Sequence, residues 1–425
     1  MPIDRREFCK AAVAIGGTGA LSACLDLGFD EPIPTGVEDP SSLPDRQHAW
    51  NDRVRTDDHG NRLLPRHQVL LYADLDGTGP PGTDARGAVA TALDTLDRAF
   101  ERSHRGLLHS AAYSPSYFDR FDAGPAAVDL PAPRRLSGFE DPEFDTQDLL
   151  VHLASDRADA VLAADAALRG DRESVNTVDV RASLTDVATV VDRRTGFVGA
   201  GMPAARQDVA GIPDSEPVPE ESPLFMGFVA GLRRNQATED RVTIREGPFA
   251  GGTTKHVSTL RQRLADWYGQ HDHDERVMEL FSPAHVGDVE GVGENLGGFN
   301  GVTDPIVESI EDHAREFGRV GHAQKAARAN RDESGEPLTL RRHFESTDDD
   351  HASLHFPSLQ RDPSTFEDVR EAMNGTDLID VTPAVRQRVN NGILEYVFVD
   401  HRGNWLVPPR RHRALPTPDP SGGPG

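Results

Sequence analysis

The stretch "HQVLLYADLDGTGPPGTDARGAVATALDTLDRAFERSHRGLLHSAAY" (67–113) sets the fold, because it places one amphipathic run between two apolar runs. Residues 67–74 and 106–113 predict strands, since each is a short apolar run bounded by Asp, Gly or Ser. Residues 84–104 predict a helix, because their apolar side chains recur at helical spacing. Those side chains are Val89, Leu93, Leu96 and Phe100.

The same order of elements continues outward from this stretch. Residues 148–155 predict a strand and the Ala-rich run 157–169 a helix. The second half repeats the pattern without repeating the sequence: its predicted strands are 254–260, 338–344 and 352–360, its predicted helices are 261–270, 274–281, 305–317 and 363–375, and 392–409 predicts a hairpin turning at Arg402-Gly403. Strand-helix-strand units of this kind predict an α+β protein, a duplicated ferredoxin-like fold with antiparallel sheets.

Composition and the order of elements predict five segments. They are an export signal with a lipobox (1–24), a disordered tether rich in Pro, Asp and Ser (25–60), an N-terminal ferredoxin-like domain (61–215), a C-terminal ferredoxin-like domain (216–410) and a disordered tail (411–425).

The charge balance of the 425-residue chain is strongly acidic. The formal net charge is −25, from 70 acidic and 45 basic residues, and only three of the basic residues are Lys. An excess of Asp and Glu with almost no Lys is typical of halophilic proteins, in which concentrated salt screens the self-repulsion. No basic stripe is left to neutralise phosphates, so nucleic acid is excluded as a partner.

The first residues, "MPIDRREFCKAAVAIGGTGALSAC" (1–24), have the form of an export signal. Arg5-Arg6 is a twin-arginine pair, and the apolar run that follows is too short to span a bilayer stably. "LSAC" resembles a lipobox in which Cys24 becomes the lipidated first residue of the mature chain. We expect twin-arginine export and an extracytoplasmic protein attached to the membrane only through Cys24; a plain signal with an incidental Cys is the alternative.

Two stretches carry candidate chemistry. The first is "VLLYADLDGTG" (69–79), which resembles the nucleophile motif of haloacid-dehalogenase-type (HAD-like) phosphatases. In that case Asp74 attacks phosphorus, Asp76 moves the proton, and both hold Mg²⁺. Lys255 and Asp288 would complete the site, although their surroundings do not fit that family's order of elements. An acidic turn after a strand is the simpler interpretation.

The second candidate covers most of the chain, from His67 to about Pro409. Segments of this region resemble, in order, segments of the dye-decolourising (DyP-type) haem peroxidases. They are "RHQVLL" (66–71), "YSPSYFDRF" (113–121), "LSGFEDPEFDTQDLLVHLASD" (136–156), "GPFAGGTTKHVSTLRQRLADWY" (247–268), "DERVMELFSP" (274–283), "PLTLRRHF" (337–344) and "ASLHFPSLQRDPSTF" (352–366). That family has a duplicated ferredoxin-like fold, which agrees with the order of elements above.

The resemblance implies haem b as cofactor and gives roles to particular residues. His322 becomes the proximal iron ligand, and Arg341 becomes the distal arginine that stabilises charge developing on peroxide. Leu354 and Phe356 share one face of their strand and line the distal pocket, with His355 pointing away. Rival histidines for the iron are His313, His343 and His355.

The family's Gly-x-x-Asp-Gly motif has its counterpart in "GFVAG" (227–231), where Gly227, Phe228 and Gly231 keep the frame and Ala230 replaces the aspartate. Because Ala cannot transfer a proton, the acid-base step is lost or is left to water and Arg341.

We therefore expect an exported haem protein with weakened hydrogen-peroxide-dependent peroxidase activity and an unknown reductant. The first alternative is a non-catalytic haem-binding or haem-handling lipoprotein. Others are a relative without haem that serves as a binding module, and the phosphatase. The sequence is compatible with a homo-oligomer.

Overall fold

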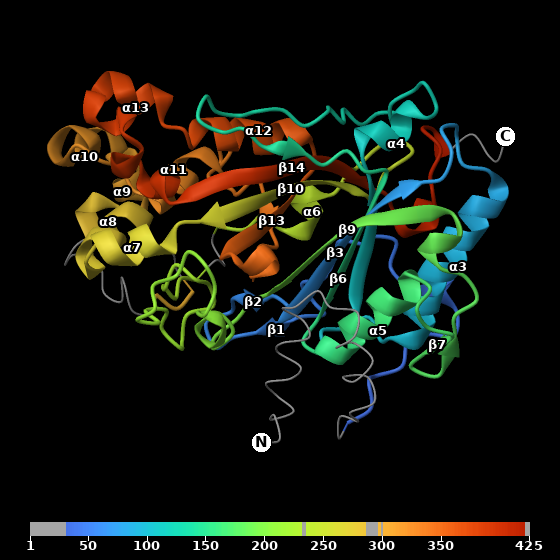
Figure 1. Ribbon diagram of the computed structural model, residues 1–425. Coiled ribbons are helices and arrows are strands. Elements are labelled where there is room, and N and C mark those ends of the chain that lie inside the picture. Colours follow the sequence, from blue (N-terminus) through green and yellow to red (C-terminus); the bar gives the residue numbers. More distant parts are fainter. Residues whose placement is uncertain (1–30, 232–234, 286–295, 299–300, 421–425) are drawn as a thin grey trace.

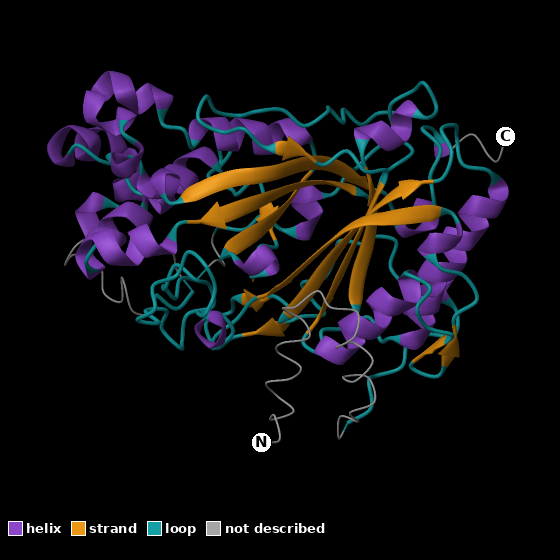
Figure 2. Cartoon of the chain, in the orientation of Figure 1, coloured by secondary structure: helices purple, strands orange, loops and turns teal. Residues whose placement is uncertain are grey.

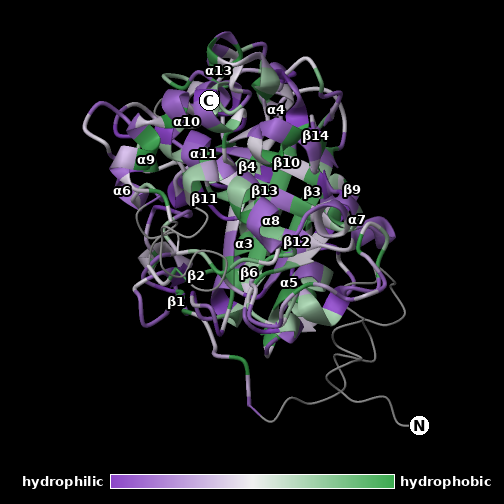
Figure 3. Ribbon diagram, turned by 90° about the vertical axis from the view of Figure 1, so that its left-hand side faces the viewer, coloured by the Kyte–Doolittle hydropathy of each residue, from purple (hydrophilic) through white to green (hydrophobic). Residues whose placement is uncertain are grey.

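The computed structural model describes residues 31–231, 235–285, 296–298 and 301–420 (Figure 1). A ten-stranded sheet forms its centre; eight of its strands make up two antiparallel four-stranded units, called the first and second sheets below, and helices gather at the two ends (Figure 2). Hydrophobic residues concentrate along the strands, while the surrounding loops are largely hydrophilic (Figure 3). The export signal, with Arg5, Arg6 and Cys24, lies outside the described residues.

The first sheet is formed by residues 67–197, which include the stretch 67–113 described above. Its elements are β3 (His67–Leu75), α3 (Thr83–Ala99), β4 (Leu108–Tyr113), β6 (Leu149–Ser155), α5 (Ala158–Leu168) and β9 (Ala188–Phe197). The strands lie in the order β9-β3-β6-β4, and every neighbouring pair is antiparallel. This is the ferredoxin-like order, and α3 and α5 bury their apolar faces with the strands in one core.

The second sheet repeats this order. Its strands are β10 (Thr253–Gln262), β11 (Leu340–Arg341), β12 (Phe344–Ser346), β13 (Ser353–Gln360) and β14 (Val397–Val407). They lie in the order β12-β13-β10-β14, again antiparallel, with β11 paired to β13. The predicted α+β class with duplicated ferredoxin-like units is therefore confirmed.

Helices occupy the long connection from β10 to β11 and the shorter one from β13 to β14. They are α7 (Leu264–Gln270), α8 (His273–Leu280), α9 (Asp304–Glu308), α10 (Ile310–Phe317), α11 (His322–Ala329), α12 (Pro363–Ala372) and α13 (Thr376–Val381). Shorter elements are β1 (Arg55–Thr56), β2 (Arg62–Leu63), α4 (Pro115–Asp119), β5 (Glu143–Phe144), β7 (Ser174–Val175), β8 (Val178–Asp179) and α6 (Glu239–Val242). Helix α12 begins where the sequence predicts, because Asp362 accepts a hydrogen bond from the backbone N–H of Ser364.

The two sheets join into a closed ring. Glu345 of β12 pairs with Phe197 of β9, and Leu406 of β14 pairs with Tyr113 of β4. Because side chains alternate along a strand, each strand sends every second residue inside the ring and the others outside. On β13, His355 points inside, where its Nδ1 lies 3.1 Å from the hydroxyl of Thr259.

The predicted hairpin over 392–409 is wrong. Residues 397–407 form the single strand β14, and Arg402 and Gly403 lie in its middle. A side chain at 403 would place its Cβ 3.0 Å from the Cβ of Asp145 and 2.8 Å from the ring nitrogen of Trp405. Gly403 therefore permits a close approach of the neighbouring segment and does not form a turn.

The described residues of the predicted tether and tail are ordered against the core, contrary to expectation. The Gln47 side chain bridges the residue after β14 and the middle of β4: its amide donates to the Pro408 carbonyl (2.7 Å) and its oxygen accepts from the Ala111 N–H (3.0 Å). Trp50 and Leu415 are buried. Residues 31–60 and 411–420 are held by such isolated anchors, which produce no apolar period in the sequence.

None of the helices in the described part of the chain is long and apolar enough to cross a membrane.

Candidate functional site

His322 begins α11, with Gly321 as the residue before the helix. The imidazole is half-buried, and it has no hydrogen-bond partner among the described residues. Burial, together with the positive charges of Lys325, Arg341 and Arg370, lowers the pKa of His322 to about 3. The ring is therefore neutral at pH 7, the state in which an imidazole nitrogen binds a metal.

The loop before β14 fixes the backbone of His322. Gly392 has a φ of +64°, and a Cβ at this position would lie 2.8 Å from the backbone nitrogen of His322. Only glycine fits here, because the contact is with backbone atoms that cannot move aside and the φ is left-handed. The loop thus packs directly against the first turn of α11.

Lys325 of α11 holds the loop before β14 against the helix through hydrogen bonds. Its side chain is buried, and its ammonium donates to the carbonyl oxygens of Met373 (2.9 Å) and Asn391 (2.8 Å) and to the side-chain oxygen of Asn391. Three acceptors satisfy the three N–H groups of an ammonium, even though burial lowers the pKa of Lys325 well below its ordinary value. Lys325 therefore fixes the position of His322, one turn earlier on the same helix.

Arg341 lies on β11, opposite Ser358 of β13. Its guanidinium makes one long hydrogen bond, to the Asn235 carbonyl at 3.3 Å, and its buried Nε has no partner among the described residues. Burial lowers the pKa of Arg341 to about 10, so the group stays charged at pH 7. A charged donor with an unused N–H is suited to an anion or to a polarised oxygen atom.

Leu354 and Phe356 lie on the outer face of β13, and both are half-buried. His355 points to the inside of the ring and is buried. The strand thus has the alternation that the sequence predicts, with two apolar side chains on the face that carries Arg341.

The 227–231 segment follows a turn over residues 224–227, and its first residue packs against Tyr268. Gly227 has a φ of +87°, and a Cβ there would lie 2.4 Å from the Tyr268 hydroxyl oxygen. The Phe228 ring is buried against Phe281, with ring centroids 5.3 Å apart. Ala230 packs against the same apolar cluster, and so does Ala323, the residue after His322. The structure therefore brings this segment and the start of α11 to one cluster.

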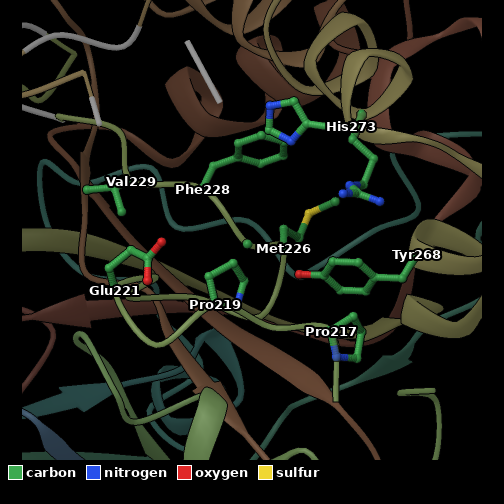
Figure 4. Close-up of a pocket in the computed structure, with 10 residues that line it drawn as sticks. Pro217, Pro219, Glu221, Met226, Phe228, Val229, Tyr268 and His273 are labelled. Carbon is green, nitrogen blue, oxygen red and sulfur yellow. The ribbon is translucent and has the colours of Figure 1, made fainter. Parts of the chain in front are cut away.

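A pocket borders the same segment (Figure 4). The Tyr268 ring lies beneath the guanidinium of Arg276, 5.0 Å from its centroid, and His273 lies beside Phe228 with ring centroids 5.9 Å apart. Met226 and Glu221 are further lining residues. The pocket is thus a mixed aromatic and charged surface next to the segment that carries Ala230.

Sequence reasoning considered His343 only as a rival iron ligand. In the structure it is buried, and its ring stacks on Phe356 with an interplanar angle of 15° and centroids 5.8 Å apart. Burial and the charge of Arg341 lower the pKa of His343 to about 3. The available signal was the spacing of two residues from Arg341, which on an extended segment means a shared face.

The phosphatase alternative fails on topology. β3 is antiparallel to both of its neighbours, whereas that chemistry requires a parallel sheet. Asp74 and Asp76 are exposed at the end of β3, while Lys255 is buried with its ammonium 3.1 Å from the Ser110 hydroxyl. Asp288 lies outside the described residues. Across those that are described, no three His, Cys, Asp or Glu side chains are grouped to hold a metal ion.

Solved structures similar to the chain share a DyP-type fold. DtpA from Streptomyces lividans, solved as an oxyferrous complex, has a TM-score of 0.54 and 19% identity over 91% of this chain and 95% of its own. A putative DyP-type peroxidase from Shewanella oneidensis has a TM-score of 0.53 and 15% identity over 82% and 94%. The encapsulated DyP-type peroxidase from Mycobacterium smegmatis has a TM-score of 0.51 and 16% identity over 84% and 96%.

At these identities the likeness shows the fold alone. No curated protein sequence matches the chain. A family model does match, over residues 65–409, and the chain therefore belongs to the family described as a family of unknown function, DUF7405.

Proposed function

We propose that this protein is a DyP-like haem protein that reacts with hydrogen peroxide and oxidises a reducing substrate. The observation that carries the proposal is the pairing of His322 and Arg341 in a DyP-like fold. A neutral imidazole and a charged guanidinium with an unused N–H lie close enough for the guanidinium to affect the pKa of the imidazole.

The residues around His322 fit a haem group. His322 would hold the iron through its free ring nitrogen. Of the positive groups that lower the pKa of His322, Arg341 has no ion pair among the described residues and is available to a bound anion. Bound haem would supply the two electrons that cleave the peroxide O–O bond and would regain them from the reductant.

The chain's own residues would do the rest. Arg341 would bind hydrogen peroxide and stabilise the negative charge that develops on it. Leu354 and Phe356 would keep water away from the reacting oxygens. Ala230 offers no proton-transfer group, so we infer a rate below that of a site with the full Gly-x-x-Asp-Gly motif; general acid-base groups typically contribute about 10²–10⁴-fold.

A spectrum of the purified protein tests the iron ligand. The wild-type protein is expected to show a Soret band, and His322→Ala is expected to lose it or to change its position. His313→Ala and His355→Ala serve as controls, because His313 bonds to the Gln324 side chain and His355 points inside the ring. A Soret band that is unchanged in His322→Ala would exclude His322 as the ligand.

The alternative is a haem-binding protein without turnover, and the observation that favours it is Ala230. Steady-state peroxidase assays separate the two functions. A normal Soret band without any peroxide-dependent oxidation across a panel of electron donors would show that the protein binds haem and is not a peroxidase.

We also propose that the protein is exported by the twin-arginine route and attached through a lipid on Cys24, on the basis of Arg5-Arg6 and "LSAC". Cys24→Ser is expected to release an exported, soluble form, and Arg5→Lys with Arg6→Lys to keep the precursor in the cytoplasm. Fractionation of cells and medium checks both. A Cys24→Ser protein that stays with the membrane would contradict the lipid anchor.

A further inference from the structure

His343 shares a face with Arg341. Between them, Arg342 points the other way: it is buried and its guanidinium donates to Glu239 at 2.9 Å. His343 stacks flat on Phe356, one of the two apolar residues on the outer face of β13. The face that carries Arg341 and Phe356 therefore also carries an imidazole.

The polar atoms on this face are not satisfied by the protein. Nδ1 of His343 and Nε of Arg341 are buried without a hydrogen-bond partner among the described residues. Leaving a buried polar atom unpaired destabilises a protein, so such atoms usually bind a ligand or water. Two of them on one face indicate a place for a small molecule that can both donate and accept hydrogen bonds, and hydrogen peroxide is such a molecule.

Other titratable groups near this face are already engaged. Glu345 is buried, and its two oxygens accept from the Phe225 N–H (2.9 Å) and the Gln262 amide (2.6 Å). His355 faces the inside of the ring. Among the described side chains of this face that can accept a proton, His343 thus keeps a ring nitrogen without a hydrogen-bond partner.

We propose that His343 is the acid-base residue of the peroxide reaction and takes the place of the aspartate missing at Ala230. It accepts a proton from one oxygen of hydrogen peroxide and delivers it to the other oxygen. The O–O bond breaks, and the protonated oxygen leaves as water with the bonding electron pair. His343 regains its starting state, so this step uses no net proton. The other oxygen takes up the two electrons that bound haem would supply, and it is released as a second water once the solvent supplies two protons and the reductant returns two electrons. This inference rests on the proposed function.

The neutral state of the ring suits this role and also limits it. Burial and Arg341 keep the pKa of His343 low, so the ring is unprotonated and can accept a proton at neutral pH. A base whose pKa lies far below the working pH is a weak one. His343 therefore supports turnover at a reduced rate.

The test uses the haem-loaded protein and two stopped-flow readouts. One is the rate of the spectral change with hydrogen peroxide. The other is the rate of cyanide binding, which involves no redox chemistry but requires hydrogen cyanide to lose a proton. His343→Ala and the similarly shaped His343→Gln are expected to slow both by about 10–10²-fold, which is below the usual acid-base contribution of about 10²–10⁴-fold because His343 is a weak base.

Two further variants sharpen the comparison. His351→Ala removes an exposed histidine from the same region and is expected to leave both rates unchanged. Ala230→Asp combined with His343→Ala is expected to restore the peroxide rate. Circular dichroism and the Soret band check that each variant is folded and loaded.

The outcomes separate this inference from the function on which it rests. If the wild-type protein reacts with peroxide and either His343→Ala or His343→Gln reacts equally fast, His343 is not the acid-base residue. If the wild-type protein takes up no haem or does not react, the proposed function fails, and the role of His343 fails with it.

Discussion

Ala230 and His343 show how much a single side chain decides at this site. From the family resemblance, the sequence predicts that a carboxylate is missing at Ala230, because the glycines at 227 and 231 keep the frame of the motif. The sequence does not point to His343 as the group proposed to replace this carboxylate. That proposal depends on two contacts seen only in the structure: the His343 ring stacks on Phe356, and its Nδ1 has no partner among the described residues. Contacts of this kind depend on which face each strand turns toward the site.

Lys325 is the residue whose removal is expected to affect the His322 environment most without touching the ring. Lys325→Met leaves the carbonyl oxygens of Met373 and Asn391 buried and without their donor. Leaving a buried acceptor without its donor costs about 1–3 kcal/mol, so we expect a loss of at least this size in the free energy of unfolding. Urea denaturation of the haem-free protein measures it.

Arg328→Met is the matched control for Lys325→Met. It removes a positive charge from the same helix, but Arg328 pairs with the exposed Asp377. An exposed ion pair contributes about 0–1 kcal/mol. If the two variants lose the same small amount, Lys325 does not hold the Asn391 loop against α11.

At the scale of elements, the strands and the first helices are predicted well from the sequence, and the connections are not. Strand β3 matches its predicted bounds to within one residue, and helix α3 begins within one residue of its predicted start, because each has a clear apolar period; α3 ends at Ala99, however, five residues before the predicted end at 104. The predicted turn at Arg402-Gly403 fails because glycine has a second use, the close approach of another segment, which no local pattern distinguishes from a turn.

The prediction of disorder for residues 31–60 and 411–420 is wrong for a related reason. Residues such as Gln47, Trp50 and Leu415 act one at a time and across long separations in the chain; for example, the Tyr117 hydroxyl donates to the Pro416 carbonyl. A composition rich in Pro and Asp predicts disorder only where no such anchors exist. The candidate site is predicted in part: the residues come from a family resemblance, while the electrostatic link between His322 and Arg341 comes from the fold.

At the scale of the whole molecule, the net charge of −25 sets the conditions under which the fold is stable. Ion pairs such as Arg402 with Glu140 are buried, so salt screens them little. Exposed pairs such as Arg315 with Glu311 contribute little in any case. Added salt therefore acts mainly on the repulsion among unpaired acidic groups.

The melting temperature is accordingly expected to rise with potassium chloride concentration. The Debye length falls from about 10 Å at about 0.1 M salt to about 3 Å at about 1 M, so most of the rise should be complete near 1 M. Differential scanning calorimetry across a salt series measures it. Sulfate salts serve as the comparison. Sulfate is excluded from the protein surface and stabilises the folded state by that route, and this effect keeps increasing above about 1 M salt, where screening is nearly complete. A melting temperature that falls, or that rises only in proportion to concentration, would show that self-repulsion does not limit the stability of this chain and would remove the physical basis for regarding it as adapted to salt.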